Sequence, residues 1–519
     1  MDLTLANKQI KIGAVLSYFQ MGLNIVIGLL YVPIMIKFLG QSEYGLYNAI
    51  VSTISMLSIL NLGFSSGYIR YYARYKSVHD ENAIKKLNGL YLIIFIVLGL
   101  IAFFCGFYLT QHLDLIFDKG LTNQEYRTAK ILMFLLTINL TVSFPMSVFS
   151  IIINAHERYI FVKTVDMIKT VLNPILSIPL LFLGYGSVGI VIITIVITFI
   201  ADCVSAFYVF VKLKNKFLFK DFEEGIFFSL FSYVTFIAVN VVIDQVNWNI
   251  DKVLLGRFRG TMEVAVYSVG ALFQTYYVMF SVALSSLFVT RIHHIVNNTI
   301  GKERDAILSD LFIRVGRFQF FILSLVVSGY IFFGKQFISY WAGFEYSEAY
   351  YVGLLFLVPL TVPLIQNLGI EIQRAENKHK YRSIVYSIMA IINFLLSVVL
   401  CQKYGAIGAA IGTAISLIVA NGLIMNLYYN NHCGLNIPLF WKSIMQMSTG
   451  LAFPVLCGFL FLSNTVRING CINLFFWIIV YSGIYMISMW CLGLNKYEKE
   501  FIKSLVSGKL KKQNGYIEE

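Results

Sequence analysis

The sequence predicts an all-α polytopic membrane protein with about fourteen transmembrane helices. The composition is the first reason, because 58% of the 519 residues are hydrophobic and only 13% are charged. A soluble domain is typically about 45–50% apolar and about 25% charged. The second reason is that apolar runs of bilayer-spanning length, roughly 20 residues, recur along the whole chain. The third is an internal repeat, which predicts two parallel six-helix bundles and an appended helix pair.

The predicted spans follow one another with connections too short to form a hydrophobic core of their own. The first run is too long for a signal peptide and is followed at once by a second span. The approximate limits of the runs are 12–36, 45–69, 88–110, 130–153, 161–184, 189–211, 226–250, 264–290, 317–341, 350–372, 383–402, 406–428, 443–463 and 470–493.

Lysine and arginine are concentrated in alternate connecting segments, and the positive-inside rule places those segments in the cytoplasm. The N-terminus is then cytoplasmic, and an even number of spans returns the basic segment from Lys496 to Lys512 to the same side. This bias accounts for most of the net charge of +13, so we expect no nucleic-acid partner.

Enzyme chemistry has little support in the sequence. The seven cysteines include no C-x-x-C pair, and the seven histidines form no H-E-x-x-H motif. A P-loop and a nucleophile elbow are also absent from the sequence. We therefore expect a protein that is not an enzyme, with no cofactor and no metal site. Any pumping would then draw on an ion gradient or on the substrate's own gradient.

The chain repeats itself at an offset of 220 residues. The motif KFLGQSEYGLY, Lys37 to Tyr47, matches RFRGTMEVAVY, Arg257 to Tyr267, at its basic, Phe, Gly, Glu and Tyr positions. A longer segment that begins at Ala155 matches one that begins at Ala375, and the pair YGSVG and YGAIG follows after a one-residue gap. The offset maps spans 1–6 onto spans 7–12, and six is even. Both copies therefore enter the membrane in the same direction.

The repeat also defines the expected domains. Residues 1–220 are expected to form an N-terminal six-helix bundle and residues 221–430 a C-terminal one. Residues 431–519 hold spans 13 and 14 and a basic cytoplasmic tail. Transporters with parallel repeats place the substrate path between the two halves.

Span 7 is rich in polar groups, as the stretch IDQVNWNIDKV shows. Spacings of 4, 3 and 4 residues put four polar side chains on one helical face: Asn240, Asp244, Asn247 and Asp251. Intramembrane acids are costly and usually functional, so Asp244 near mid-helix is a candidate for ion coupling. Asp251 and Lys252 lie closer to the outer interface, where they line the rim of a cavity or form a solvated helix end.

Subtracting the offset places a matching polar stripe on span 1. Gln20 corresponds to Asn240 and Asn24 corresponds to Asp244, and both lie on one helical face. Two such stripes across a pseudo-two-fold axis predict a wet central cavity. Interhelical hydrogen bonding is the alternative for Gln20 and Asn24.

Three further charged residues are candidates for function. Arg70 ends span 2 and Arg291 ends span 8, at nearly equivalent positions of the repeat. Arginine binds phosphate in a bidentate manner, so these residues are a candidate phosphate site, and positive-inside anchoring is the alternative. Asp202 in span 6 is a second intramembrane acid and a candidate for coupling to H⁺ or Na⁺.

Several motifs resemble those of one family of membrane proteins. They are LGQSEYGLY after span 1, NLGFSSGYIRYYAR at the end of span 2, NIDKVLLG after span 7 and YGxxG before spans 6 and 12. Nearly the whole chain resembles the polysaccharide-repeat flippases, which serve O-antigen, capsule and exopolysaccharide synthesis. That family belongs to the multidrug/oligosaccharidyl-lipid/polysaccharide exporter superfamily. The middle of span 1 departs from the lipid II flippase, because Gln20 and Asn24 are uncharged where that flippase has a basic residue.

The resemblance implies a function. Such a protein moves an oligosaccharide linked to undecaprenyl pyrophosphate from the inner to the outer leaflet of the bacterial cytoplasmic (inner) membrane, by alternating access of its two halves. The resemblance also implies that Arg70 and Arg291 contact the pyrophosphate. The expected partners are membrane lipids and a polysaccharide polymerase.

Two other functions fit parts of the sequence. A multidrug cation antiporter of the same superfamily usually has twelve spans and an acidic cavity, and spans 13 and 14 argue against it. A membrane polymerase or glycosyltransferase normally has a large outer loop with acidic catalytic residues. The longest outer connection here is only about residues 111–129, with Asp114 and Asp118.

Overall fold

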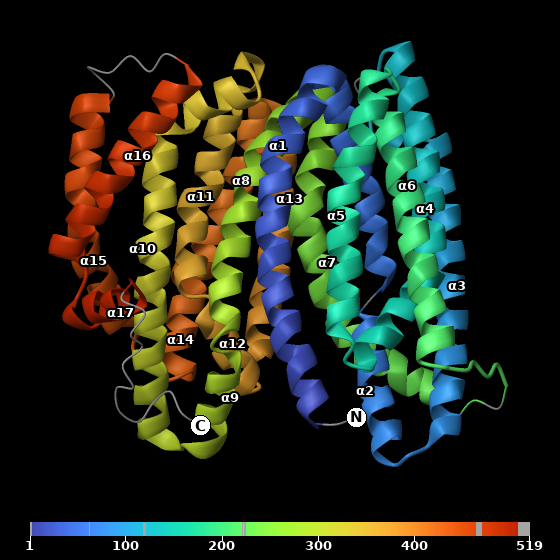
Figure 1. Cartoon of the computed structure of the whole chain (residues 1–519). Helices are drawn as coiled ribbons and strands as arrows, with labels where there is room; N and C mark the ends of the chain where they lie inside the picture. Colours follow the sequence, from blue (N-terminus) through green and yellow to red (C-terminus); the bar gives the residue numbers. More distant parts are fainter. Residues whose placement is uncertain are drawn as a thin grey trace. The chain divides into compact units, whose positions relative to one another are not determined.

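The computed structural model of this protein describes residues 3–61, 63–117, 121–220, 222, 225–462 and 470–506. All regular secondary structure within these ranges is helical (Figure 1). The predicted all-α fold class is therefore confirmed. Long helices follow from apolar sequence in which glycine and proline interrupt the pattern at few points.

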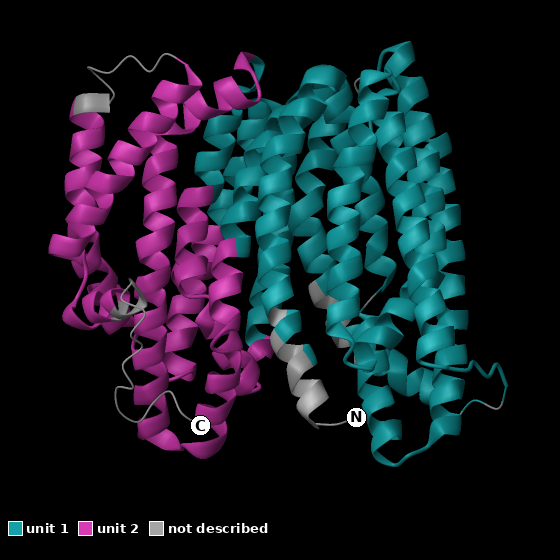
Figure 2. Cartoon of the chain, viewed as in Figure 1, with its two compact units in different colours: residues 1–279, 345–356, 381–416 teal, residues 280–344, 357–380, 417–519 magenta. Residues whose placement is uncertain are grey.

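The chain forms two compact units, shown in different colours in Figure 2. Unit 1 comprises Met1–Met279, Glu345–Phe356 and Tyr381–Ser416. Unit 2 comprises Phe280–Phe344, Leu357–Lys380 and Leu417–Glu519. The units follow packing and not chain order, so the division at residues 220 and 430 stays a prediction.

The first part of the chain contributes eight α-helices and three short helical turns. They are α1 (Leu3–Leu57), η1 (Ser58–Asn61), α2 (Phe64–Ser77), α3 (Glu81–Gln111), η2 (Leu113–Leu115), α4 (Asn123–Ala155), α5 (Tyr159–Phe182), α6 (Gly186–Phe207), η3 (Tyr208–Lys212), α7 (Ile226–Phe258) and α8 (Thr261–Ser286). Helices α1 to α7 lie entirely in unit 1, and α8 continues into unit 2.

The remaining elements lie mostly in unit 2, and only residues 345–356 and 381–416 return to unit 1. They are α9 (Val289–Asn298), α10 (Gly301–Trp341), η4 (Phe344–Tyr346), α11 (Ala349–Ile365), α12 (Leu368–Ala375), α13 (His379–Leu417), η5 (Ile418–Met425), α14 (Asn426–His432), α15 (Ile437–Cys457), η6 (Gly458–Leu462), α16 (Cys471–Ser488), η7 (Met489–Gly493) and α17 (Lys496–Val506). In unit 2, Arg317 of α10 is buried and pairs with Glu498 of α17, which fixes the last helix to the bundle.

Two of the longest helices are each interrupted at one glycine. Gly40 divides α1 with φ 71° and ψ 173°, and Gly405 divides α13 with φ 59° and ψ −136°. These backbone conformations favour glycine, because a Cβ atom would clash with the backbone. The predicted spans 1 and 2 lie on either side of Gly40, and spans 11 and 12 lie on either side of Gly405.

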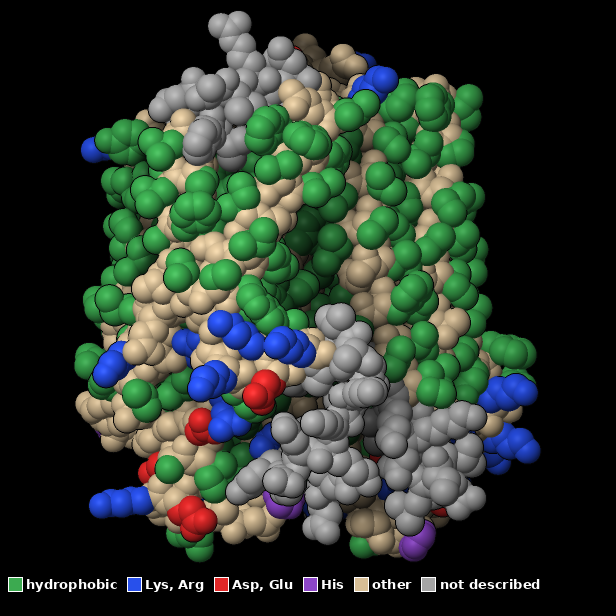
Figure 3. Space-filling view, turned by 60° about the vertical axis from the view of Figure 1, so that its left-hand side comes forward, with side chains coloured by type: hydrophobic (Ala, Val, Ile, Leu, Met, Phe, Trp, Pro, Cys, Tyr) green, Lys and Arg blue, Asp and Glu red, His purple; other side chains and the backbone are tan. Residues whose placement is uncertain are grey.

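Ten helical segments of the described chain are long and apolar enough to cross a membrane, or eleven if the pair α11 and α12, bent by 44°, counts as one span. This count treats Val15–Ser77 and His379–His432 as single segments, although a glycine interrupts each, and it leaves out α7. The number fourteen therefore stays a prediction. On the face drawn in Figure 3, hydrophobic side chains form a broad band, and Lys and Arg gather mostly toward the lower end.

Candidate functional site

The repeated motifs form the same helix cap in both copies. Glu43 Oε1 accepts hydrogen bonds from the backbone N–H of Ser187 (2.7 Å) and from its hydroxyl (2.6 Å), at the first turn of α6. Glu263 Oε2 accepts one from the backbone N–H of Ala406 (2.8 Å), just after the break in α13. A carboxylate at a helix N-terminus satisfies a free N–H group and interacts favourably with the helix dipole.

The glycine of each YGxxG motif leaves room for that carboxylate. Gly186 (φ 56°) and Gly405 (φ 59°) both have left-handed backbone conformations. A Cβ atom would lie 2.5 Å from Glu43 Oε1 at the first position and 2.6 Å from Glu263 Oε2 at the second. Two features that occur in both copies of the repeat, a glutamate and a distant glycine, therefore contact each other in each copy.

A polar network connects α7, α8 and α13 within unit 1. Asp251 is only 1% exposed, and its Oδ2 accepts hydrogen bonds from Tyr267 Oη (2.6 Å) and Thr413 Oγ1 (2.8 Å). Thr413 Oγ1 also lies 3.4 Å from Asn393 Oδ1, which accepts a hydrogen bond from Ser397 at 3.4 Å. The second carboxylate oxygen of Asp251, Oδ1, is buried with no hydrogen-bond partner among the described residues.

The first copy has a corresponding network without an acid. Asn173 Nδ2 donates to Thr194 Oγ1 (3.0 Å), and Ser177 Oγ donates to Asn173 Oδ1 (3.1 Å). Asn173 and Ser177 are 220 residues before Asn393 and Ser397, and Thr194 precedes Thr413 by 219. Tyr31 takes the place of Asp251 in this copy, close to Ser177.

The network around Asp251 contains oxygen atoms of the kind that ligate cations. They are Asp251 Oδ1, Asn393 Oδ1, Ser397 Oγ and Thr413 Oγ1. Hard cations bind oxygen atoms, and a buried carboxylate with a free oxygen also accepts a proton. These residues therefore fit a monovalent cation or H⁺. In the described part of the chain no three His, Cys, Asp or Glu side chains cluster as metal ligands.

The predicted polar stripes lie on α1 and α7. These helices are in contact, and Ala49, beyond the break in α1, lies close to Gly256 of α7. Gln20 and Asn24 of α1 are half-buried, as is Asn247 of α7, and Asp244 is exposed. The side chain of Asn240 lies outside the described residues. Which of these side chains lines a cavity stays a prediction.

The end of the α7 stripe differs from a solvated helix end. Asp251 is buried between helices, so water does not surround it, and Lys252 is half-buried.

Arg70, near the middle of α2 in unit 1, and Arg291, in α9 of unit 2, are both exposed. Their expected shared role at a phosphate group stays a prediction.

Asp202 of α6 is half-buried and lines a polar cavity of about 20 Å³. Asp166 and Lys169 of α5 line the same cavity and form an ion pair at 3.2 Å. A cavity of this size holds about one water molecule. The sequence alone offered no partner for Asp202, and the structure places the Asp166–Lys169 pair of the neighbouring helix around the same cavity.

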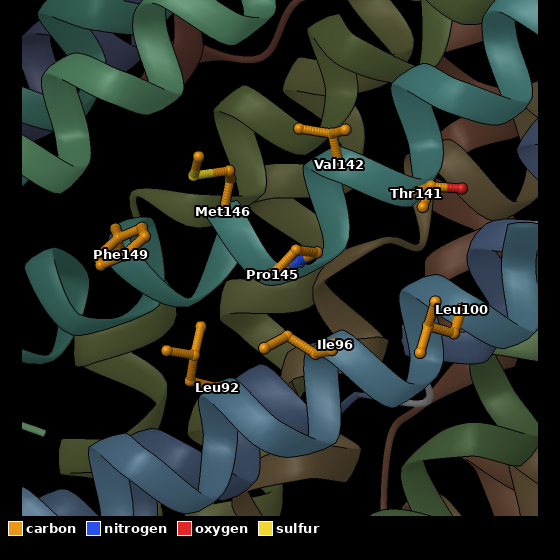
Figure 4. Close-up of a pocket in the computed structure, with 8 residues that line it drawn as sticks. All are labelled: Leu92, Ile96, Leu100, Thr141, Val142, Pro145, Met146 and Phe149. Carbon is orange, nitrogen blue, oxygen red and sulfur yellow. The ribbon is translucent and has the colours of Figure 1, made fainter. Parts of the chain in front are cut away.

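A larger groove, with a volume of about 440 Å³, is lined by the closely packed helices α3 and α4 (Figure 4). It is lined by Leu92, Ile96, Leu100, Thr141, Val142, Pro145, Met146 and Phe149. The only side-chain hydroxyl in this lining, on Thr141, already donates to the Thr137 carbonyl at 2.8 Å. The groove therefore suits a hydrocarbon chain and offers a sugar no free hydrogen-bond donor.

Comparison with known proteins adds independent findings. Residues 13–291 match the family model described as polysaccharide biosynthesis protein. A putative O-antigen transporter of Shigella flexneri is 23% identical over 412 residues, which cover 76% of this chain and 91% of that protein.

Solved structures with the same fold include the lipid II flippase MurJ in an inward closed conformation, with a TM-score of 0.69 and 16% identity over 95% of this chain and 99% of that chain. An inward-facing multidrug resistance transporter of the MATE family has a TM-score of 0.58 and 16% identity, over 80% of this chain and 99% of that chain. These relatives are transporters and flippases and not enzymes. The predictions of a multi-pass transporter fold and of a protein that is not an enzyme are therefore confirmed.

Proposed function

This chain belongs to the polysaccharide biosynthesis protein family, and from that premise we propose that it is a flippase for a lipid-linked oligosaccharide. The substrate class is a glycan repeat unit on undecaprenyl pyrophosphate, moved from the inner to the outer leaflet of a bacterial cytoplasmic membrane. The observation that carries the proposal is that α1 and α7, at equivalent places in the repeat, each carry polar side chains inside otherwise apolar sequence. The similarity to an O-antigen transporter supports the same substrate class.

The physical need for such a protein follows from the chemistry of the substrate. Each polar group left unsatisfied in hydrocarbon costs roughly several kcal/mol, and an oligosaccharide has many hydroxyl groups. Polar side chains such as Gln20, Asn24 and Asn247 replace water for the sugar, while the polyprenyl tail stays among lipids. The proposed roles of Arg70 and Arg291 are contacts to the pyrophosphate, for which guanidinium groups are suited.

We further propose that a cation gradient drives the cycle. Asp251 supports this role best, because it is a buried acid with one free oxygen among neutral oxygen donors. Asp244 and Asp202 are the other acids proposed for coupling to H⁺ or Na⁺. Alternating access of residues 1–220 against residues 221–430 is the proposed motion, with N- and C-termini in the cytoplasm and a polysaccharide polymerase downstream.

Deletion of the gene tests the proposed function. A flippase mutant is expected to accumulate lipid-linked glycan that a membrane-impermeant oxidant reaches in inverted vesicles but not in intact spheroplasts. Glycan that is reached in spheroplasts but remains unpolymerised would instead indicate a polymerase. Unchanged glycan together with increased sensitivity to cationic drugs would indicate the antiporter.

A further inference from the structure

Helices α1, α4 and α8 meet at one end of unit 1, close to Gly40. Ser42 Oγ of α1 lies 3.0 Å from Thr261 Oγ1 of α8. Both hydroxyls donate to Glu125 Oε1 of α4, with a Thr261 distance of 3.2 Å. A single carboxylate oxygen therefore joins residues that lie 219 positions apart in the chain.

Glu125 is held in place independently of these two hydroxyls. Its other oxygen, Oε2, accepts hydrogen bonds from the backbone N–H of Thr122 (2.9 Å) and from the Thr122 hydroxyl (2.8 Å). The Thr122 hydroxyl in turn accepts one from the Glu125 backbone N–H, which completes a capping box at the start of α4. The capping box therefore holds the other oxygen, Oε1, in position for Ser42 and Thr261 without any contribution from those two residues.

The backbones of α1 and α8 approach closely at the same point. A Cβ atom on Gly45 would lie 1.8 Å from the Thr261 carbonyl oxygen and 3.1 Å from the Ala265 nitrogen. Gly45 and Ala265 are 220 residues apart and are therefore equivalent positions of the repeat. Contact between equivalent positions is expected where the two copies meet on their symmetry axis.

Adjacent residues of the motif have different partners here. Glu43 caps α6 within its own copy, and Ser42 bonds to Glu125 and contacts Thr261 of the other copy. Ser42 and Glu125 are half-exposed, so water can replace their hydrogen bonds at a modest net cost, and Thr261 is 6% exposed. Thr261 is the member of this group that belongs to the second copy, so its contacts with Ser42 and Glu125 are the ones that must open if the copies separate at this end.

We propose that Ser42, Glu125 and Thr261 form a latch that holds the two copies together at this end and opens once in each transport cycle. The inference rests on the proposed function, because alternating access requires the copies to separate at one end and then at the other. In the predicted orientation this end faces outward, so the closed latch belongs to a state that is shut toward the outside.

A reversible cross-link tests the latch. The variant S42C/T261C is expected to form a disulfide under copper phenanthroline, to lose transport when oxidised and to regain it in dithiothreitol. The matched control N173C/T194C joins α5 to α6 inside the first copy, across an equally short contact of 3.0 Å, and is expected to transport in both states. Complete cross-linking of S42C/T261C with transport unchanged would overturn the proposal.

A labelling experiment separates failure of the latch from failure of the proposed function, since it requires no substrate. A cysteine at Asn24 is expected to react faster with a membrane-impermeant maleimide from outside when Glu125→Ala is also present, by up to roughly tenfold for the one hydrogen bond lost between the copies, from Thr261 to Glu125. The same Asn24→Cys protein with Glu125 intact supplies the baseline, and the parent protein supplies the signal of the native cysteines. An unchanged rate in the Glu125→Ala protein would contradict the latch, whatever the gene deletion shows about the glycan.

Discussion

Helices α1 and α7 occupy equivalent places in the repeat, but only α7 carries acids within the polar stretch. Asn24 and Tyr31 of α1 correspond to Asp244 and Asp251 of α7 at the offset of 220. The surrounding Asn, Ser and Thr side chains are kept in both copies and make corresponding contacts. A neutral residue is therefore compatible with packing at this place, which supports the proposal that the acid of the second copy serves coupling.

The proposed coupling role also bears on the cost of burying Asp251. Burial of a carboxylate is unfavourable unless its oxygens are paired, and Oδ1 has no partner among the described residues. A cation or proton bound there, as proposed for coupling, would remove that cost. The second copy is thus the proposed coupling copy, and the first is its neutral counterpart.

The largest expected effect comes from removing the buried acid that only the second copy carries. Asp251→Asn is expected to lower transport by roughly tenfold or more, the size of a typical coupling free energy of about 1–3 kcal/mol, with the protein still present in the membrane. Initial rates of glycan translocation in proteoliposomes, with and without Na⁺ and pH gradients, measure this effect. Tyr31→Phe is the matched control and should transport normally, whereas an Asp251→Asn protein with full, gradient-dependent transport would remove Asp251 from coupling.

A smaller loss is expected at the other acid of α7. Asp244→Asn makes this position identical to Asn24 and is expected to reduce surface glycan severalfold, because an intramembrane acid is usually functional. Glycan on intact cells and protein in membrane fractions are both measured. Normal surface glycan in this mutant would refute a transport role for Asp244.

The helix caps should respond alike in both copies, which sharpens the contrast with the acids. Glu43→Ala and Glu263→Ala each remove a side chain that caps a helix N-terminus, at a cost of about 0.5–2 kcal/mol. Thermal unfolding in detergent is expected to shift to lower temperature by similar amounts in the two variants. A shift in only one of them would show that the two caps are not equivalent.

The smallest expected effect is a pH dependence of the free energy of unfolding that arises at His156. The equivalent position in the second copy is Glu376. His156 follows α4 and contacts the ring of Tyr72, and burial lowers its pKa below the ordinary value of 6.5. The unfolded chain therefore binds the proton more tightly, so the free energy of unfolding should fall as the pH drops below about 6.5. Unfolding temperatures between pH 7.5 and 5.5 measure this trend, and His156→Gln should flatten it.

The sequence by itself determined the features that depend on composition and order along the chain. Apolar runs required helices in a membrane, because only satisfied backbone groups are stable there. The offset of 220 identified Glu43, Glu263, Asn173 and Asn393 as repeated, although not what they contact. The polar face of α7 followed from helical spacing alone.

The tertiary structure decided which of these side chains meet. Glu43 contacts Ser187, 144 residues away, Asp251 contacts Thr413, 162 residues away, and Glu125 joins Ser42 to Thr261. Helical periodicity gives the face on which a residue lies but not the neighbour packed against it. The sequence therefore left Asp251 between a solvated end and a cavity rim. Packing of α7 against α8 and α13 buried it instead, because those helices supply the hydroxyl groups that a buried carboxylate requires.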